Sequence, residues 1–131
     1  MIVVDTSALI AILRREPEKA RFEEIIGEAS VRLVCAVTVL EASMVAIGRN
    51  AAEAGKGLDA VLDSMDIRIV PFDENLAAVA RDAFVRFGKG RHPAGLNMGD
   101  CASYALAKSL GLPLLFKGND FSQTDVASAL A

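Results

Sequence analysis

Short apolar runs alternate along this chain with longer stretches in which apolar residues recur every three or four positions. The runs predict four strands, at Met1–Val4, Val31–Val37, Ile67–Val70 and Pro113–Phe116. The clearest helical stretch follows Asp73, where one stripe contains Leu76, Val79, Ala80, Ala83, Phe84 and Phe87. Strands separated by helices predict crossover connections and a parallel sheet of four to five strands. The expected fold class is therefore α/β, a single three-layer α/β/α domain over residues 1–131.

Capping residues indicate where several helices begin and end. Asp5 precedes the first helix, and Thr38 is expected to cap a later helix that Gly48 ends. Asp100 is expected to open the helix that ends near Gly111. The last residues fit an edge strand and a short helix equally well.

Four acidic residues stand apart from other charges in apolar parts of the sequence. Asp5 is the only charged residue among the first thirteen, and Glu41 is the only one in residues 33–48. Asp100 is isolated in the same way, and Asp120 has a single lysine near it. Each follows a predicted strand or lies in a helix near the same sheet edge, where ligands of parallel sheets collect. We therefore expect the four carboxylates to converge.

Each acid also has an ordinary explanation when it is taken alone. Asp5 and Asp100 stand where helix caps are common. Glu41 would be explained by a buried arginine partner, and Asp120 by a turn after Gly118. These explanations stay open at the level of single residues.

A divalent cation would explain all four acids together. A buried carboxylate costs several kcal/mol unless it is compensated, and converging carboxylates repel one another and raise their own pKa values. The candidate ligands are all oxygens, with no histidine or cysteine nearby at metal-binding spacing. Mg²⁺ or Mn²⁺ therefore fits better than Zn²⁺.

Composition narrows the possible partners. Apolar residues make up 53% of the chain and aromatic residues 5%, without tryptophan, so a base-stacking platform is poorly supplied. We interpret the apolar surplus as surface that is buried in an oligomer or a complex. The net charge of −3 argues against a broad basic face. Setting the four acids aside from the 17 acidic residues leaves 13 against 14 basic ones, so the rest of the molecule is nearly neutral.

Localisation is expected to be cytoplasmic. The N-terminal apolar run is interrupted by Asp5 and followed by its arginines, unlike a secretory signal. No stretch approaches the roughly 20 apolar residues that span a bilayer. Cys35 and Cys101 lie in apolar surroundings without CxxC spacing, as buried free thiols do in a reducing compartment.

Four segments in this order resemble one family over almost the whole chain. They are "VVDTSAL", the lone Glu41, "NMGDCASYALA" and "LLFKGNDF". Together they resemble the PIN-domain ribonucleases, and specifically the VapC toxins of VapBC toxin–antitoxin pairs. The resemblance implies that the four acids form a catalytic cluster that binds Mg²⁺ or Mn²⁺. It implies that Asp5 and Asp100 are the principal ligands of the ion and that Glu41 acts through a water molecule. Asp120 would either help to bind a second ion or hold the water shell of the first ion.

The resemblance also implies supporting residues. Thr6 and Ser7 are candidates for hydrogen bonds to a metal ligand or to the scissile phosphate, with helix capping as the alternative. Asn119 is a candidate to orient Asp120, and Asp125 is a weaker fifth acid. RNA phosphates would be held near the rim by four further residues, Lys89, Arg91, His92 and Lys117.

The implied reaction is metal-dependent hydrolysis of RNA, leaving 5′-phosphate and 3′-hydroxyl ends. The residues support this independently, because a metal-free ribonuclease commonly needs two acid–base groups and the chain has only His92. The implied partners are a VapB-like antitoxin, which supplies DNA binding and blocks the site, and a second copy of the chain.

Two alternative functions stay open beside the ribonuclease interpretation. A phosphoacceptor or Asp-nucleophile phosphatase also places an Asp and Mg²⁺ at a strand end, but it needs a further acid close to Asp5, where this chain has Thr6 and Ser7. A catalytically idle PIN fold would serve as a protein-binding module. The four intact acids favour an active enzyme over that module.

Overall fold

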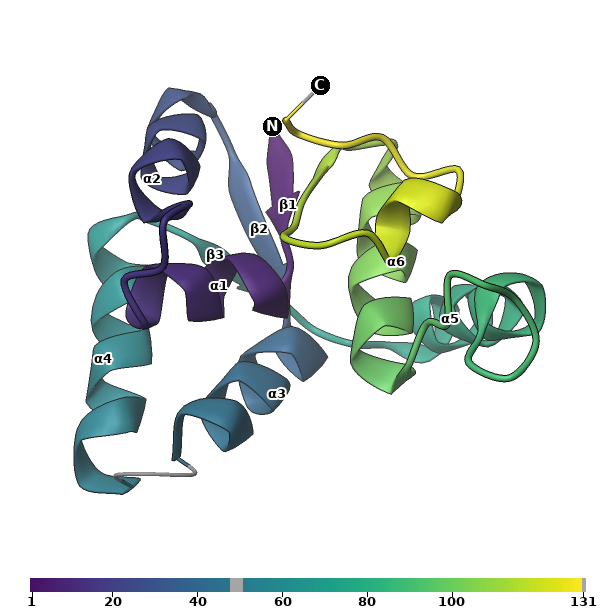
Figure 1. Cartoon of the computed structure of the whole chain (residues 1–131), viewed down its shortest axis with the longest axis horizontal. Coiled ribbons are helices and arrows are strands. Elements are labelled where there is room, and N and C mark those ends of the chain that lie inside the picture. Colours follow the sequence, from purple (N-terminus) through teal and green to yellow (C-terminus); the bar gives the residue numbers. More distant parts are fainter. Residues whose placement is uncertain (48–50, 131) are drawn as a thin grey trace.

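The sheet consists of four parallel strands in the order β3-β2-β1-β4. The computed structural model describes residues 1–47 and 51–130, with side chains for all of these except 51–54 (Figure 1). The strands are β1 (Ile2–Val4), β2 (Arg32–Cys35), β3 (Arg68–Val70) and β4 (Leu114–Leu115). The predicted parallel sheet is confirmed, and its strands are shorter than the apolar runs.

Helices cover both faces of this sheet, as expected. They are α1 (Thr6–Leu13), α2 (Lys19–Glu28), α3 (Ala36–Ile47), α4 (Ala51–Ser64), α5 (Glu74–Phe87) and α6 (Met98–Leu110). In Figure 1 the strands β1 and β2 stand between α5 and α6 on one side and α2 and α4 on the other. Among the described residues, none of the helices combines the length and apolarity that crossing a membrane requires.

The strands β1, β2 and β4 contribute apolar side chains to both layers, because successive residues of a strand point to opposite faces. The edge strand β3 packs only Val70 against one core, and its Ile69 is exposed. Val3 and Leu114 pack in the core under α5 and α6. Val4 and Leu115 pack in the core under α1, α2 and α4. This double burial explains why β1 and β4 are wholly apolar, without alternating polar residues. Cys35 and Cys101 are buried free thiols, which confirms the interpretation of the cysteines.

Two helix starts differ from the prediction. The helix α3 begins at Ala36, directly after β2, so Thr38 lies inside it and the expected cap is wrong. Thr38 is fully buried and shares a 3.0 Å hydrogen bond with Ser103 Oγ of α6. The helix α6 begins at Met98, so Asp100 is its third residue and does not open it. The expected helix end at Gly48 lies outside the described residues.

The C-terminal segment contains both of the structures that the sequence left open. A short 3₁₀ helix, η1, spans Phe121–Gln123, and Ser128 then forms a parallel bridge with Leu114 of β4. Asp125 lies between them and accepts a hydrogen bond from the Tyr104 hydroxyl.

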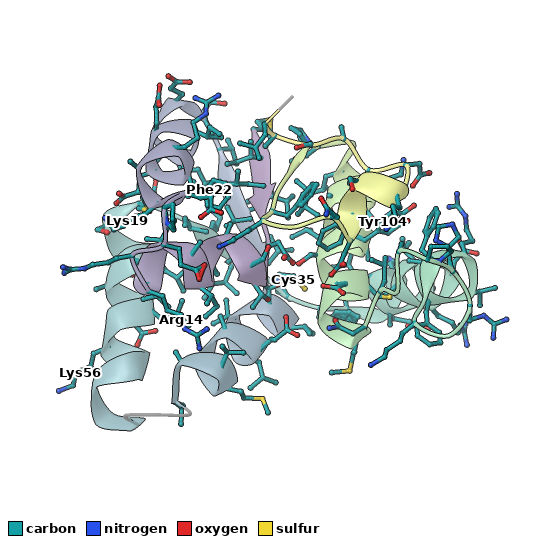
Figure 2. All side chains as sticks on the ribbon, in the orientation of Figure 1. Arg14, Lys19, Phe22, Cys35, Lys56 and Tyr104 are labelled. Atoms are coloured by element: carbon teal, nitrogen blue, oxygen red, sulfur yellow. The ribbon has the colours of Figure 1, made fainter. Side chains whose placement is uncertain are left out.

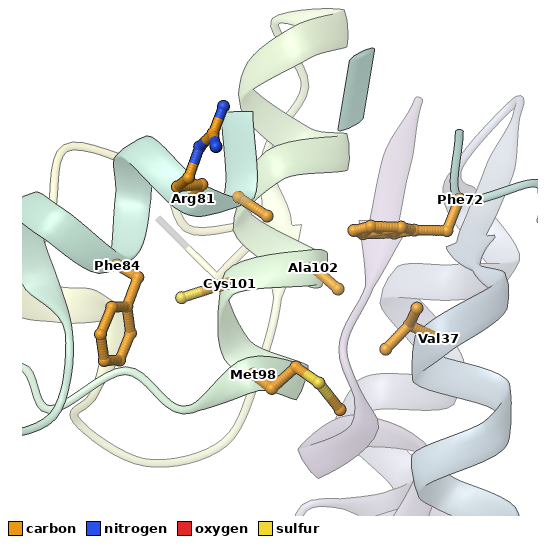
Figure 3. A pocket seen from close by; sticks show the side chains of 8 residues that line it. Val37, Phe72, Arg81, Phe84, Met98, Cys101 and Ala102 are labelled. Carbon is orange, nitrogen blue, oxygen red and sulfur yellow. The ribbon is translucent and has the colours of Figure 1, made fainter. Parts of the chain in front are cut away.

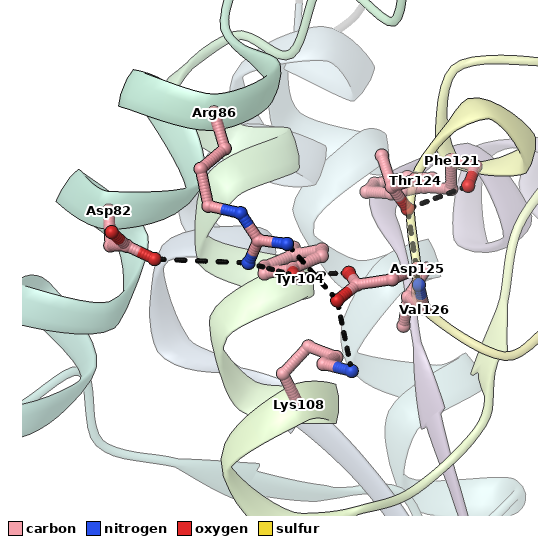
Figure 4. Close-up of polar contacts among 8 residues, drawn as sticks. All are labelled: Asp82, Arg86, Tyr104, Lys108, Phe121, Thr124, Asp125 and Val126. Carbon is pink, nitrogen blue, oxygen red and sulfur yellow. Dashed lines mark hydrogen bonds and ion pairs between the residues drawn. The ribbon is translucent and has the colours of Figure 1, made fainter.

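Asp125 belongs to this C-terminal contact and not to the acidic cluster. Its Oδ2 lies 3.4 Å from Arg86 Nη2 and 3.4 Å from Lys108 Nζ (Figure 4). The hydrogen bond from Tyr104, with these cations, lowers the pKa of Asp125. Burial and the same hydrogen bond raise the pKa of Tyr104 to about 12. The expectation of a fifth acid in the cluster is therefore wrong, because Asp125 fastens the C-terminal segment to α5 and α6.

Candidate active site

Asp5 lies at the carboxyl end of the central strand β1, where it also caps α1. Only 2% of its surface is exposed. Its Oδ2 accepts hydrogen bonds from Ser7 N at 3.0 Å and Ser7 Oγ at 2.7 Å. Its Oδ1 is buried and accepts no hydrogen bond from any residue that the structure describes. A buried carboxylate oxygen without a partner is costly, so this atom indicates a missing ligand.

The surroundings of Asp5 oppose its ionisation. Burial raises the pKa of the Asp5 carboxyl, against the lowering effect of the hydroxyls of Ser103 and Ser7. The Ser103 hydroxyl also shares a 3.0 Å hydrogen bond with Thr38 Oγ1, in which either hydroxyl can be the donor. A positive charge beside Oδ1 would stabilise the ionised form.

Asp100 is held at the start of α6 by a capping box. Its Oδ2 accepts a hydrogen bond from Asn97 N at 3.0 Å, and Asp100 N donates to Asn97 Oδ1 at 2.9 Å. The pKa of Asp100 is raised to about 7, first by burial and then by the negative charges of three other acids, Asp5, Asp120 and Glu41. The fold therefore brings the other three predicted acids within electrostatic reach of Asp100.

Glu41 of α3 reaches the site through a close approach to α6. Its Oε1 accepts a 2.6 Å hydrogen bond from Thr6 Oγ1. A Cβ atom added to Gly99 would overlap the Glu41 carboxylate. The missing side chain at Gly99 therefore provides the space that this carboxylate occupies.

The three inner acids line one open depression of about 480 Å³. Each uses one carboxylate oxygen within the protein: Asp5 Oδ2 for Ser7, Glu41 Oε1 for Thr6 and Asp100 Oδ2 for Asn97. The second oxygen of each has no hydrogen bond to any residue in the described ranges, and in Asp5 this oxygen is buried. Asp120 is exposed at the start of η1 and does not line the depression.

These free oxygens are suitable donors for a hard divalent cation. Within residues 1–47 and 51–130, no three carboxylate, imidazole or thiol groups are already placed to hold an ion. One oxygen of each carboxylate accepts a hydrogen bond from the protein, which holds the side chain in place. The residue types and the orphaned Asp5 Oδ1 fit a Mg²⁺ or Mn²⁺ ligand set.

The two hydroxyls after Asp5 do not cap α1, because the Asp5 side chain is the cap and both residues lie inside the helix. Thr6 orients Glu41, as described above. Ser7 Oγ donates to Asp5 and accepts a 2.9 Å hydrogen bond from Lys117 N, so it joins β1 to the loop after β4. The backbone carbonyl oxygen of Asn119 accepts a 2.7 Å hydrogen bond from Ser122 Oγ. The described part of the chain shows no side-chain hydrogen bond from Asn119 to Asp120.

The expected basic rim is only partly found. Lys117 lines the depression, but Lys89, Arg91 and His92 do not. Their loop folds back on the end of α5. Lys89 N donates to Leu96 O at 3.0 Å. The His92 ring packs edge-on against Phe87, with ring centroids 5.2 Å apart. The expectation that these three residues lie at the rim is therefore wrong.

Three residues of the site were missed by the sequence analysis. They are Arg14, which lines the depression, Gly99 and Ser103. A glycine in the first turn of α6 is a usable signal, because glycine is unfavourable inside helices and needs a packing reason. Nothing in the local pattern distinguishes Arg14 or Ser103 from an ordinary surface arginine or core serine.

Comparisons with known proteins agree with this arrangement. A family profile described as the PIN domain matches residues 2–127. A VapC ribonuclease of Mycobacterium bovis is 45% identical over 97% of this chain and 97% of its own length. A ribonuclease VapC of Mycolicibacterium smegmatis is 46% identical over 97% of this chain and 98% of its own length. This chain belongs to the VapC family of PIN-domain proteins.

The VapC fold is also found among solved structures. VapC20 of Mycobacterium tuberculosis, described as a toxin that cleaves the sarcin–ricin loop, superposes with a TM-score of 0.78 and 18% identity, covering 97% of both chains. At that identity the likeness shows the fold alone. Membership of the VapC family excludes the phosphoacceptor and phosphatase alternative. A catalytically idle module would have the same fold as an active VapC protein. The two differ in whether they cleave RNA, and a cleavage experiment therefore distinguishes them.

Proposed function

We propose that this protein is the toxin of a toxin–antitoxin pair and an endoribonuclease that hydrolyses RNA phosphodiester bonds with a bound Mg²⁺ or Mn²⁺. The observation that supports it most is the buried, partnerless Asp5 Oδ1 beside two further carboxylates, each with one oxygen to spare. The ribonuclease names of relatives 45% and 46% identical over nearly the whole chain support the reaction class.

The roles of the residues follow from their contacts. Asp5 Oδ1, Asp100 Oδ1 and Glu41 Oε2 would hold the ion, with Asp120 acting at its outer side. The chemistry supplied by a bound ion is activation of water and stabilisation of negative charge on the phosphate and the leaving oxygen. Ser7, Thr6 and the Asn97 backbone hold these carboxylates in place. Hard oxygen donors favour Mg²⁺ or Mn²⁺ over Zn²⁺.

An antitoxin is the proposed protein partner, and DNA binding is assigned to that antitoxin. A DNA-bound VapBC complex from Salmonella typhimurium shares the fold, with a TM-score of 0.73 and 19% identity. The chain itself has a net charge of −3, which does not suit broad binding to DNA. A cytoplasmic site of action is part of the same proposal.

A homodimer is also proposed, and an apolar surface supports it. A cavity between α3, α5 and α6 is lined by Val37, Phe72, Phe84 and Met98 (Figure 3). A second apolar cavity shares Val37 and Met98 with it and extends along α3 past Met44. Met98 is 78% exposed and Met44 66% exposed, which is unusual for large apolar side chains outside an interface.

Cleavage of RNA is expected to require the metal ion. Antitoxin-free protein should cut a mixed RNA pool in Mg²⁺ or Mn²⁺ and leave it intact in EDTA. Without a cation, the carboxylates repel the phosphate and nothing offsets the negative charge that develops on it. The measurement is gel analysis of end-labelled RNA, with identification of 5′-phosphate ends. Equal cleavage in EDTA would contradict the proposed chemistry, and absence of cleavage in every metal would favour the idle binding module.

Metal binding is expected to strengthen from about pH 5.5 to about pH 8, because an ion must displace the proton that Asp100 holds below its pKa of about 7. Without metal, the pH dependence of the stability of the fold has the opposite sign. A pKa raised above the unfolded value of 3.8 stabilises the fold fully below that value, and this contribution is lost as pH rises through about 7. Thermal unfolding in EDTA and in Mg²⁺, at both pH values, measures the stability of the metal-free protein and the increase that Mg²⁺ produces. A Mg²⁺-induced shift that is equal at both pH values would contradict it.

A further inference from the structure

The acidic depression contains two cationic side chains, Arg14 and Lys117, in different electrostatic states. Lys117 Nζ lies 3.1 Å from Glu16 Oε1 and 3.2 Å from Glu18 Oε2, so its charge is already shared between two carboxylates. Arg14 forms no ion pair with any acid in the part of the chain that the structure describes. Its guanidinium is the cation at this site that remains available to an external anion.

The position of Arg14 suits contact with a ligand in the depression. Arg14 is the residue that ends α1, fixed by a 2.9 Å hydrogen bond from its backbone N to Ile10 O. Its side chain is exposed and lies on the side of α1 that faces α3 (Figure 2). Asp5 begins the same helix, so α1 places an arginine at one end and the central carboxylate at the other.

A cation is needed here because of the charge of the site. RNA is a polyanion, and the depression presents the carboxylates of Asp5, Glu41 and Asp100 to it. A divalent ion offsets part of this repulsion at the scissile phosphate but does not act on the neighbouring phosphates. A guanidinium binds a phosphate with two parallel hydrogen bonds, which also fixes the orientation of the strand.

We propose that Arg14 binds a phosphate of the RNA backbone adjacent to the phosphodiester that is cleaved. This inference rests on the proposed ribonuclease function. It assigns a substrate-binding role to a residue outside the carboxylate cluster, and it leaves Lys117 as a structural cation that ties the loop after β4 to Glu16 and Glu18.

The test compares Arg14→Gln with Arg15→Gln, a matched control. Arg15 is the adjacent exposed arginine, and it does not line the depression. Binding of a fluorescein-labelled, random-sequence single-stranded RNA is measured by anisotropy at several KCl concentrations in Mg²⁺. Both substitutions are made in an Asp100→Asn protein, so that cleavage does not interfere. Steady-state cleavage by the same single variants of the wild-type protein provides KM and kcat.

Arg14→Gln is expected to raise Kd by about fivefold and to reduce the slope of log Kd against log salt by about 0.7, the value for one lost phosphate contact on a single strand. KM should rise while kcat stays within about twofold. Arg15→Gln should change none of these. Equal effects of the two substitutions, or a fall in kcat at unchanged KM, would overturn the assignment.

The failure of this inference is distinguishable from failure of the proposed function. If the wild-type protein cleaves no RNA in any metal, the ribonuclease function itself is refuted. If it cleaves RNA and Arg14→Gln behaves as Arg15→Gln does, only the role of Arg14 is refuted. Thermal unfolding of both variants checks that the exposed substitutions leave the fold intact.

Discussion

Replacing Asp5 or Asp100 with asparagine is expected to abolish RNA cleavage, by at least about 1,000-fold, while the protein stays folded. Asparagine has the same shape, and its carbonyl oxygen can still accept the hydrogen bonds from Ser7 or Asn97 that hold each side chain. The amide lacks the negative charge that binds a divalent cation. Because burial raises the pKa of Asp5, removing its charge should leave the free energy of unfolding in EDTA unchanged or higher.

Asp73→Asn provides a matched control for this experiment. Asp73 caps α5 as Asp5 caps α1, with its Oδ1 accepting a 2.9 Å hydrogen bond from Leu76 N, but it lies outside the depression. The same chemical change should leave its cleavage rate and Mg²⁺-induced thermal shift at wild-type values. Metal-dependent cleavage that survives in Asp5→Asn and in Asp100→Asn would refute the carboxylate site.

Gly99→Ala is expected to weaken Mn²⁺ binding and cleavage by about tenfold or more without destabilising the fold. The added Cβ would occupy the position of the Glu41 carboxylate, which must then move and lose its hydrogen bond from Thr6. Alanine is intrinsically better than glycine inside a helix by about 1 kcal/mol, so stability should stay equal or increase. The functional loss and the stability change therefore have opposite signs.

The control is Gly27→Ala in α2, where an added Cβ meets no atom within 4 Å. It should raise stability in the same way and leave Mn²⁺ affinity unchanged. Calorimetric titration with Mn²⁺ measures affinity directly, and urea unfolding measures stability. If Gly99→Ala binds Mn²⁺ as tightly as Gly27→Ala does, the close contact between α6 and Glu41 has no role in the site.

The sequence was sufficient to predict the carboxylate cluster, because the signal is a charge in the wrong surroundings. Asp5 follows a fully apolar strand, and parallel strands bring their carboxyl ends to one edge. The same logic predicted the sheet and its two helical layers. Convergence of Asp5, Glu41 and Asp100 is confirmed, because all three line one depression. Asp120 lies outside the depression, and its negative charge contributes to the raised pKa of Asp100. Their function as metal ligands stays a proposal.

The incorrect predictions share one physical cause. They depend on contacts between residues that are distant in the chain, and the local sequence pattern does not encode such contacts. Thr38 has the composition of a helix cap, but the chain turns into α3 at Ala36 and the hydroxyl is satisfied by Ser103 of a distant helix. Lys89 and Arg91 are cationic loop residues, yet their loop closes on the end of α5 and neither residue lines the acidic depression. Arg14 is found at the site only through the direction of α1.

The capping box at the start of α6 has a consequence for how this protein can diverge. Asn97 and Asp100 hold each other within four residues, and the loop before them is closed separately by the bridge between Gly88 and Leu96. The orientation of the Asp100 carboxylate is therefore set locally and does not depend on the length or composition of that loop. Insertions and substitutions between Gly88 and Leu96 can accumulate over evolution while the chemistry stays intact, so this segment is free to diversify.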